Sequence, residues 1–168
     1  MIVSDQSVHA GLVSVIIPTY NRAHLAVQAI QSVRSQTWAN VQIIVVDDGS
    51  TDDTTALVSQ FSDVLLLTQK QGGQAEARNL GLRHAVGEYV ATLDSDDLWQ
   101  PTLLQRSVEA LVKLDADFVF ANWHAHDQTR DVHYQSYFEQ FYGWQDFPLT
   151  ELTHWRMMLP LPQKHQSP

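Results

Sequence analysis

The sequence predicts an α/β fold with a mainly parallel central sheet. Apolar, β-branched runs of strand length alternate along the chain with segments whose apolar residues recur at helical spacing. Several runs are apolar almost throughout, which is typical of parallel strands covered on both faces. Polar loops follow these runs, and open α/β sheets bind ligands at the carboxyl ends of their strands.

The expected strands lie in order along the first two thirds of the chain. They are Val13–Ile17, Val41–Val46, Val64–Leu67, Glu88–Leu93 and Phe118–Ala121. The first strand is expected to stop at Pro18, because proline cannot donate to a sheet ladder. The run Glu88–Leu93 reads as a buried strand, rich in β-branched and aromatic residues.

The expected helices fill the intervals between these strands. One follows Asn21, a suitable N-cap, and runs to about Ser35. A second lies around Ala56–Phe61. A third runs from Gln74 to Ala85, with Ala75, Leu80 and Ala85 inward and Gly87 closing it, and a fourth follows Pro101.

Charge and composition exclude several classes of protein. Ten Lys and Arg against nineteen Asp and Glu give a net charge of -9, which argues against a nucleic-acid surface. Without cysteine, the chain has no disulfide or thiol chemistry. We see no signal peptide and no apolar run of membrane-spanning length, so we expect a cytoplasmic protein and leave peripheral membrane association open.

One short acidic turn stands out after the fourth strand. Asp94, Asp96 and Asp97 follow Leu93 directly, and carboxylates crowded at a strand end repel one another until a hard divalent cation relieves them. On an extended backbone Asp94 and Asp96 point the same way. The alternative is an acidic, solvated turn, since so short a motif often occurs by chance.

Three loops carry the motifs of the chain: Pro18–Arg22, Asp47–Ser50 and Asp94–Asp97. Together with Ala77-Arg78-Asn79 and Gly87-Glu88-Tyr89, they resemble the inverting family 2 glycosyltransferases from about Val13 to Asn122. The resemblance implies the Rossmann-like GT-A fold of the nucleotide-diphospho-sugar transferases. It also implies transfer of a sugar from a nucleotide diphosphate to an acceptor hydroxyl, in cell wall or polysaccharide biosynthesis.

The resemblance assigns nucleotide binding to two of these loops. Pro18, Thr19 and Tyr20 match the first nucleotide loop, where the aromatic ring lies against the base. Asp48 matches the carboxylate that reads the base or ribose, and an acceptor-only group can select a ring N–H. The alternative for Asp47 and Asp48 is helix capping and turn formation.

The resemblance places the remaining site residues around the acidic turn. Gly73 and Arg78 match the lining of the nucleotide pocket, although Arg78 could instead form a structural ion pair. Asp94 and Ser95 match the start of the Asp-x-Asp motif, near the ribose and phosphate. Asp96 matches its metal-binding acid, for Mn²⁺ or Mg²⁺. Asp97 is expected to act on the following helix start, or to order the groups around the metal without binding it directly.

The general base cannot be identified from the sequence. In the family it lies downstream of where this chain ends, and the remaining acids qualify by type only: Asp127, Asp131, Glu139, Asp146 and Glu151. We therefore expect the donor-binding part of a longer enzyme, inactive alone. The expected donor is a UDP-sugar, because the resemblance implies the nucleotide that the family commonly uses. The expected acceptor is a saccharide or a lipid-linked glycan.

The chain is expected to divide into three parts. Residues 1–11 form a flexible leader, residues 12–122 the nucleotide-sugar-binding domain, and residues 123–168 the truncated start of an acceptor-side region. That last part is aromatic and histidine-rich. A lid, an oligomer contact such as a homodimer interface, or the remnant of a larger domain all fit it. A metal site at His124 and His126 is the weaker reading.

Two other functions compete with glycosyl transfer. A non-catalytic sugar-nucleotide-binding module would explain the missing base. A Mg²⁺-binding phospho-receiver domain also pairs acids after a strand, as in Val45-Val46-Asp47-Asp48. However, a strand and helix precede this acid pair, and no later strand ends in the expected lysine, so this analogy is one of fold alone.

Overall fold

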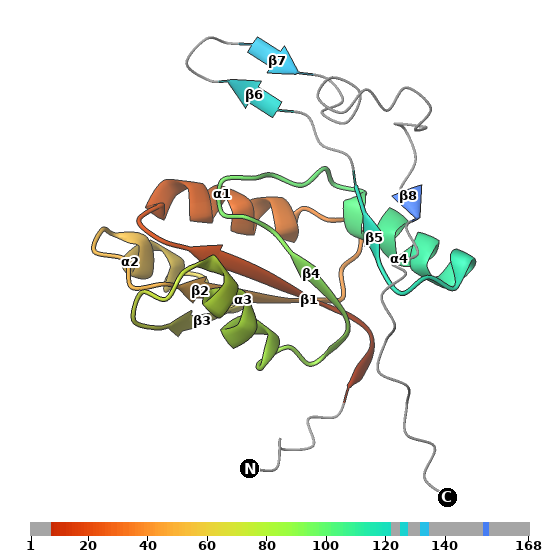
Figure 1. Ribbon diagram of the computed structural model, residues 1–168, viewed down its shortest axis with the longest axis horizontal. Coiled ribbons are helices and arrows are strands. Elements are labelled where there is room, and N and C mark those ends of the chain that lie inside the picture. The colour runs from red at the N-terminus through yellow and green to blue at the C-terminus, as the bar shows by residue number, and fades with distance from the viewer. Residues whose placement is uncertain (1–7, 122–124, 128–131, 135–152, 155–168) are drawn as a thin grey trace, which may run out of the picture. The chain divides into compact units, whose positions relative to one another are not determined.

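Four parallel strands form the central sheet, in the order β3-β2-β1-β4. They are β1 (His9–Thr19), β2 (Val41–Asp47), β3 (Val64–Thr68) and β4 (Gly87–Thr92). The computed structural model describes residues 8–121, 125–127, 132–134 and 153–154 (Figure 1). The chain divides into two compact units, residues 1–105 and 106–168, and the sheet belongs to the first. The prediction of an α/β fold with a parallel sheet is confirmed.

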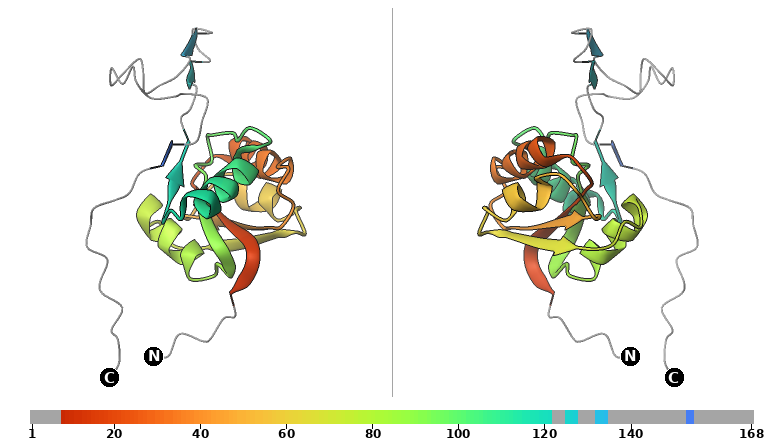
Figure 2. Two further views of the ribbon diagram at one scale, coloured as in Figure 1. Left: turned by 90° about the vertical axis from the view of Figure 1, so that its right-hand side faces the viewer. Right: turned by 90° about the vertical axis from the view of Figure 1, so that its left-hand side faces the viewer.

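Helices cover both faces of this sheet. On one face lie α1 (Ala23–Arg34) and α2 (Thr54–Val58), which contact each other, and on the other lies α3 (Gln74–Leu82), against β1 and β2 (Figure 2). Right-handed crossovers explain the division. The chain moves from β1 to β2 to β3 in one direction and then returns past β1 to β4.

The core is built from the alternating side chains of β1 and β2. Ile16, Ile44 and Val46 are at most 1 % exposed and pack with Ala77 of α3. The buried residues of α1 are small or β-branched, and they are Ala23, Ala26, Ala29, Ile30 and Val33. Because both faces of these strands are buried, their sequences are largely apolar.

Strand β1 is longer than predicted at both ends. It begins at His9, inside the expected leader, where the Gly11 N–H donates to Glu88 Oε2 at 2.7 Å. It also continues through Pro18, which pairs in register with Val46 of β2. The β4 side of β1 pairs only as far as Ile16, so Pro18 has no ladder bond to lose there.

Helix α3 and strand β4 also differ from expectation. Helix α3 ends at Leu82, and Gly87 begins β4 instead of closing the helix. In α3 Ala77 and Gly81 are buried, whereas Ala75 is exposed. Burial alternates along β4, with Val90 47 % exposed, so the expectation of a wholly buried strand is wrong.

The expected fifth strand does not join the parallel sheet in the described residues. Strand β5 (Val119–Phe120) pairs antiparallel with β8 (Thr153–His154), and β6 (Ala125–Asp127) pairs antiparallel with β7 (Val132–Tyr134). Helix α4 (Leu103–Leu114) precedes β5. The partner of β5 comes from far along the chain, which a local pattern cannot reveal. None of the helices in the described part of the chain is long and apolar enough to cross a membrane.

Candidate functional site

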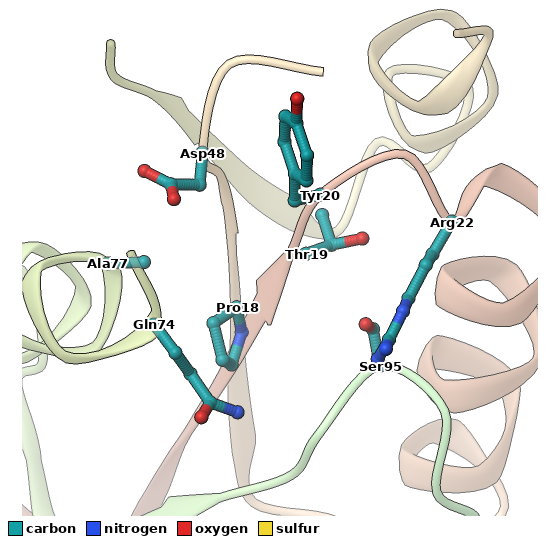
Figure 3. A pocket seen from close by; sticks show the side chains of 8 residues that line it. All are labelled: Pro18, Thr19, Tyr20, Arg22, Asp48, Gln74, Ala77 and Ser95. Carbon is teal, nitrogen blue, oxygen red and sulfur yellow. The ribbon is translucent and has the colours of Figure 1, made fainter. Parts of the chain in front are cut away.

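A pocket of about 230 Å³ lies where β1 and β2 end, between the start of α3 and the loop after β4 (Figure 3). Eight residues line it: Pro18, Thr19, Tyr20, Arg22, Asp48, Gln74, Ala77 and Ser95. The carboxyl ends of parallel strands meet at one edge of a sheet, which explains why segments so far apart in sequence converge here. Five of the eight are residues that the sequence predicted for a site: Pro18, Thr19, Tyr20, Asp48 and Ser95.

The end of β1 supplies a polar atom without a partner. Thr19 is 3 % exposed, and among the described residues its Oγ1 has no hydrogen-bond partner. Its hydroxyl points to the side of the pocket where Arg22 and Ser95 lie (Figure 3). Buried hydroxyls are normally paired, so an unpaired one in a pocket marks a place where a ligand gains a hydrogen bond. Tyr20 beside it is 39 % exposed, with its ring open to a ligand.

Hydrogen bonds join the loop after β1 to the loop after β2. The Asn21 N–H donates to Ser50 Oγ at 2.9 Å, and the Thr51 N–H donates to Asn21 Oδ1 at 2.7 Å. Asn21 has a φ of 50°, in the left-handed region that asparagine tolerates. The N-cap of α1 is Arg22, so the prediction of Asn21 is wrong by one residue.

Side chains of the second loop satisfy the first N–H groups of α1. The Arg22 N–H donates to Thr54 Oγ1 at 3.2 Å, and the Ala23 N–H donates to Asp52 Oδ2 at 3.3 Å. Hydrogen bonds, first from the Thr54 hydroxyl, lower the pKa of Asp52 against a smaller opposing effect of burial. The segment after β1, which forms one wall of the pocket, is thus held in place by side chains of the segment after β2.

The two adjacent acids after β2, Asp47 and Asp48, form hydrogen bonds with different segments. Asp47 accepts from the Ser50 N–H at 2.9 Å and from the Thr55 hydroxyl, so it forms the turn, as the alternative for this pair predicted. Asp48 accepts from Gln69 Nε2 at 2.6 Å, from the Gly72 N–H at 2.8 Å and from the Gly73 N–H at 2.7 Å. Asp48 therefore holds the loop after β3 against the pocket.

The environment of Asp48 favours its charged form. The side chain lies at the pocket wall, 5 % exposed, with its carboxylate turned away from Tyr20 (Figure 3). Burial raises its pKa, but the three hydrogen bonds together outweigh burial, so the pKa lies below its ordinary value. A carboxylate has about four lone-pair sites, and these bonds use three, which leaves one for a ligand.

Gly73 marks the start of α3. Its φ is 92°, a conformation that strains any residue with a Cβ, and no atom lies within 4 Å of where a Cβ would be. The glycine is therefore required by the backbone turn that brings its N–H to Asp48. It does not line the pocket directly, and its predicted place in the nucleotide site becomes an indirect one.

The first acid of the acidic turn is tied to α3. Asp94 Oδ1 accepts from Arg78 Nη2 at 2.6 Å and from Gln74 Nε2 at 2.9 Å. Both charged side chains are 37 % exposed. Arg78 is outside the pocket lining, and this ion pair is the alternative that the sequence left open for it. Ser95, 3 % exposed, lines the pocket near the end of the Arg22 side chain (Figure 3).

The second and third acids differ in their neighbours. Asp96 Oδ2 lies 2.8 Å from Arg22 Nη1. Asp97 donates its backbone N–H to Asp94 O at 2.9 Å and lies well before Leu103, where α4 begins, so its expected role at the helix start is wrong. Burial and then the charges of Asp96 and Asp94 raise the pKa of Asp97, while Arg22 lowers it. Negative charge is therefore crowded at this turn.

The sequence missed three of the lining residues: Arg22, Gln74 and Ala77. Arg22 and Ala77 stood inside motifs that were quoted as whole segments, and no pattern singled them out. Ala77 projects only a methyl group into the pocket (Figure 3), and its size keeps the space open. Gln74 is the first residue of α3, and its position at the pocket depends on the turn before that helix, which no sequence pattern specified.

The acids that qualify as a general base by type lie away from this pocket in the sequence. Asp127 lies in β6, and the other four, Asp131, Glu139, Asp146 and Glu151, lie outside the described residues. Outside them also lies His124. Among the described residues, no three His, Cys, Asp or Glu side chains are grouped so that they could hold a metal ion.

Curated relatives share much of this chain. One is the UDP-Glc:alpha-D-GlcNAc-diphosphoundecaprenol beta-1,3-glucosyltransferase WfgD of Escherichia coli, 41 % identical over 67 % of this chain and 46 % of its own length. Another is the glycosyltransferase GlyG of Streptococcus pneumoniae, 36 % identical over 70 % of this chain and 41 % of its own. The chain thus spans less than half of the length of each of these two relatives.

Solved structures share the fold. The 1–349 fragment of S. aureus TarS in complex with UDP-GlcNAc aligns with a TM-score of 0.63 at 28 % identity, over 71 % of this chain and 36 % of that one. The mannosyltransferase PcManGT of Pyrobaculum calidifontis, in complex with GDP-Man and Mn²⁺, aligns with a TM-score of 0.52 at 35 % identity, over 59 % of this chain and 32 % of that one. The predicted GT-A fold is therefore confirmed. The family model for glycosyl transferase family 2 matches residues 14–160, and the chain belongs to that family.

Proposed function

We propose that this chain is the donor-binding part of an inverting glycosyltransferase, which moves a sugar from a nucleotide diphosphate to an acceptor hydroxyl. The observation that supports this most is the pocket at the strand ends, with an exposed tyrosine ring, an unpaired threonine hydroxyl and an ionised aspartate around one space. Aromatic rings stack on bases and carboxylates accept from ring N–H groups, so these groups suit a nucleoside.

Uracil is the base that we favour. The relative named for a UDP-Glc donor is 41 % identical, and the TarS structures aligned at a TM-score of 0.62 or 0.63 include complexes with UDP and UDP-GlcNAc. The structure named with GDP-Man aligns less closely, at 0.52. The WfgD name also includes a diphosphoundecaprenol acceptor. We therefore propose a lipid-linked or saccharide acceptor, reached from residues beyond the pocket.

The acidic turn suits a hard cation. Mg²⁺ and Mn²⁺ prefer carboxylate oxygens, and they are commonly held by one or two carboxylates together with substrate phosphates and water. Burial and then the charges of Asp96 and Asp94 raise the pKa of Asp97, and such a cation would neutralise those charges. Asp96 would hold it, and the cation would stabilise the departing diphosphate as a Lewis acid. Thr19, Tyr20 and Asp48 would orient the nucleotide.

A non-catalytic sugar-nucleotide-binding module is the second candidate. It rests on the same pocket, and no general base has been assigned. Both candidates predict donor binding, and only a transfer assay on a longer protein that includes the acceptor side distinguishes them.

Calorimetric titration of the 168-residue chain with UDP, GDP and dTDP, with Mn²⁺ and with EDTA, tests donor binding. We expect UDP to bind most tightly, and Mn²⁺ to increase its affinity. Thr19→Val keeps the shape and removes the unpaired hydroxyl, so it should weaken UDP binding about fivefold, the scale of a neutral hydrogen bond. Protein stability should not fall, because no bond within the described chain is lost.

Thr68→Val is the matched control, since Thr68 likewise ends a strand of the sheet, β3, but lies outside the pocket lining. It should bind UDP as the wild type does. Failure of a folded wild-type sample to bind any of the three nucleotides, with or without metal, would count against the proposed function.

A further inference from the structure

Arg22 and Asp96 approach each other from different loops. Arg22 lies just before α1, and its side chain extends along the pocket toward Ser95 (Figure 3). Its Nη1 is 2.8 Å from Asp96 Oδ2, and the two side chains are 45 % and 46 % exposed. The acid that suits a cation is thus neutralised by an arginine that also lines the ligand pocket.

A cation and this guanidinium compete for the same carboxylate oxygen. A half-exposed ion pair is weak, worth about fivefold or less in an equilibrium constant, so a divalent ion can displace one partner. The main chain of Arg22 need not move, because its N–H is held by Thr54 Oγ1. Only the exposed side chain has to change its rotamer.

The displaced guanidinium has a second acceptor within the same pocket. Arginine binds phosphate oxygens through two parallel N–H donors, more strongly than neutral groups do. A nucleoside diphosphate in the pocket would bring such oxygens next to Arg22. The same side chain could therefore neutralise Asp96 before binding and the diphosphate after it.

The second ion pair of the turn is built differently. Arg78 is outside the pocket lining, and the Asp94 oxygen that it contacts also accepts from Gln74 at 2.9 Å. Asp94 would keep a donor if Arg78 left, but Arg78 does not line the pocket in which a diphosphate would bind. The features that permit an exchange of partners are found together only at Arg22 among the pairs of the described residues at this turn.

We propose that Arg22 is a positioning residue that exchanges partners, leaving Asp96 when a divalent cation binds and pairing with the donor diphosphate. This inference rests on the proposed function. It makes cation and nucleotide binding cooperative, because each favours the arrangement that the other needs.

Two titrations of Arg22→Gln test the exchange. Binding of Mn²⁺ without nucleotide, followed by the electron paramagnetic resonance signal of the free ion, should become about two- to fivefold tighter, because Asp96 loses its competitor. Binding of UDP at saturating Mn²⁺, followed by calorimetry, should become about tenfold weaker or more, because a charged phosphate contact is lost. The exchange requires both changes.

Arg34→Gln is the matched control. Arg34 ends the same helix and pairs with Asp63 at 3.2 Å, with side chains 51 % and 48 % exposed, so the change in net charge is identical. Both affinities should stay within about twofold of the wild type. Thermal unfolding by circular dichroism should show that each variant is folded. Arg22→Lys keeps the charge near Asp96, so its Mn²⁺ affinity should match the wild type while UDP binding weakens.

The outcomes separate the two proposals. Unchanged or weaker Mn²⁺ binding by Arg22→Gln, or unchanged UDP binding, overturns the exchange while leaving the proposed function intact. Absence of UDP binding by the folded wild type overturns both. Tighter Mn²⁺ binding together with weaker UDP binding, absent from Arg34→Gln, supports the exchange.

Discussion

Asp48 connects ligand binding to the stability of the loop after β3. Asp48→Asn replaces one acceptor oxygen by an NH₂ group that faces N–H donors, so at pH 7 the free energy of unfolding should fall by about 1–3 kcal/mol. The folded pKa of Asp48 is below the unfolded value of 3.8. Its stabilisation is therefore present above pH 3.8 and is lost as the pH falls through the folded pKa.

Urea unfolding between pH 2.5 and 7 measures both effects. The wild type should lose more stability on acidification than Asp48→Asn, which has no charge there to lose. Asp63→Asn removes a half-exposed carboxylate of the surface and should cost less than about 1 kcal/mol at pH 7. Equal losses at acid pH for the wild type and Asp48→Asn would contradict this account of Asp48.

Asp96 and Asp97 should respond differently to the same substitution. Asp96→Asn should lower Mn²⁺-dependent UDP affinity by a few kcal/mol, the scale of a lost charged contact. Asp97→Asn should leave that affinity largely intact. The folded pKa of Asp97 is raised above the unfolded value of 3.8, so the folded state loses stability as Asp97 ionises on going from acid to neutral pH. At pH 7 the removal of this charge by Asp97→Asn should therefore increase the free energy of unfolding slightly, by less than about 1 kcal/mol.

Calorimetry and urea unfolding of the two variants at pH 7 provide the comparison, each serving as the control for the other. Loss of Mn²⁺-dependent binding in Asp97→Asn, with Asp96→Asn unaffected, would reverse the two assignments. The roles proposed for Asp94 and Ser95 would then have to be reassigned with them.

At the scale of elements, Gly87 allows β4 to approach β1 closely. A Cβ on Gly87 would lie 2.6 Å from Leu12 O and 2.8 Å from Ser14 N, both main-chain atoms that cannot move aside. The Gly87 N–H also donates to Ser14 Oγ at 2.9 Å. Gly87→Ala should therefore lower the free energy of unfolding by about 1–3 kcal/mol, the usual effect of overpacking.

Gly72→Ala is the control for Gly87→Ala in urea unfolding. Its Cβ would meet chiefly the carboxylate of Glu76, the far end of a flexible side chain, and its φ is outside the left-handed region. Stability should stay near that of the wild type, because the side chain can turn away. Equal stability of Gly87→Ala and the wild type would show that the two strands separate without cost.

Across the whole molecule, the sequence predicted those features that depend on residues close to one another along the chain. The apolar runs Val13–Ile17 and Val41–Val46 predicted strands because strands buried on both faces are mainly apolar. Contacts between distant segments were missed. Asn21 looked like a helix cap, yet its partners are in the loop after β2, and Phe120 pairs with Thr153.

The candidate site shows the same division. Its three loops were predicted because parallel strands bring their carboxyl ends to one edge. The bonds of Asp48 to Gly72 and Gly73, and of Arg22 to Asp96, depend on side-chain directions in three dimensions. No spacing in the sequence reports them.

The hydrogen bonds of Asn21 with Ser50 and Thr51, and of the Arg22 N–H with Thr54, have a thermodynamic consequence for the pocket. They order two of its walls during folding, so the conformational entropy of these main-chain segments is lost before any ligand arrives. A ligand then has to immobilise only side chains such as Tyr20 and Arg22, at about 0.5–1.5 kcal/mol each. The free energy of its contacts is therefore retained largely as affinity, and the association rate is set by diffusion and charge more than by loop closure.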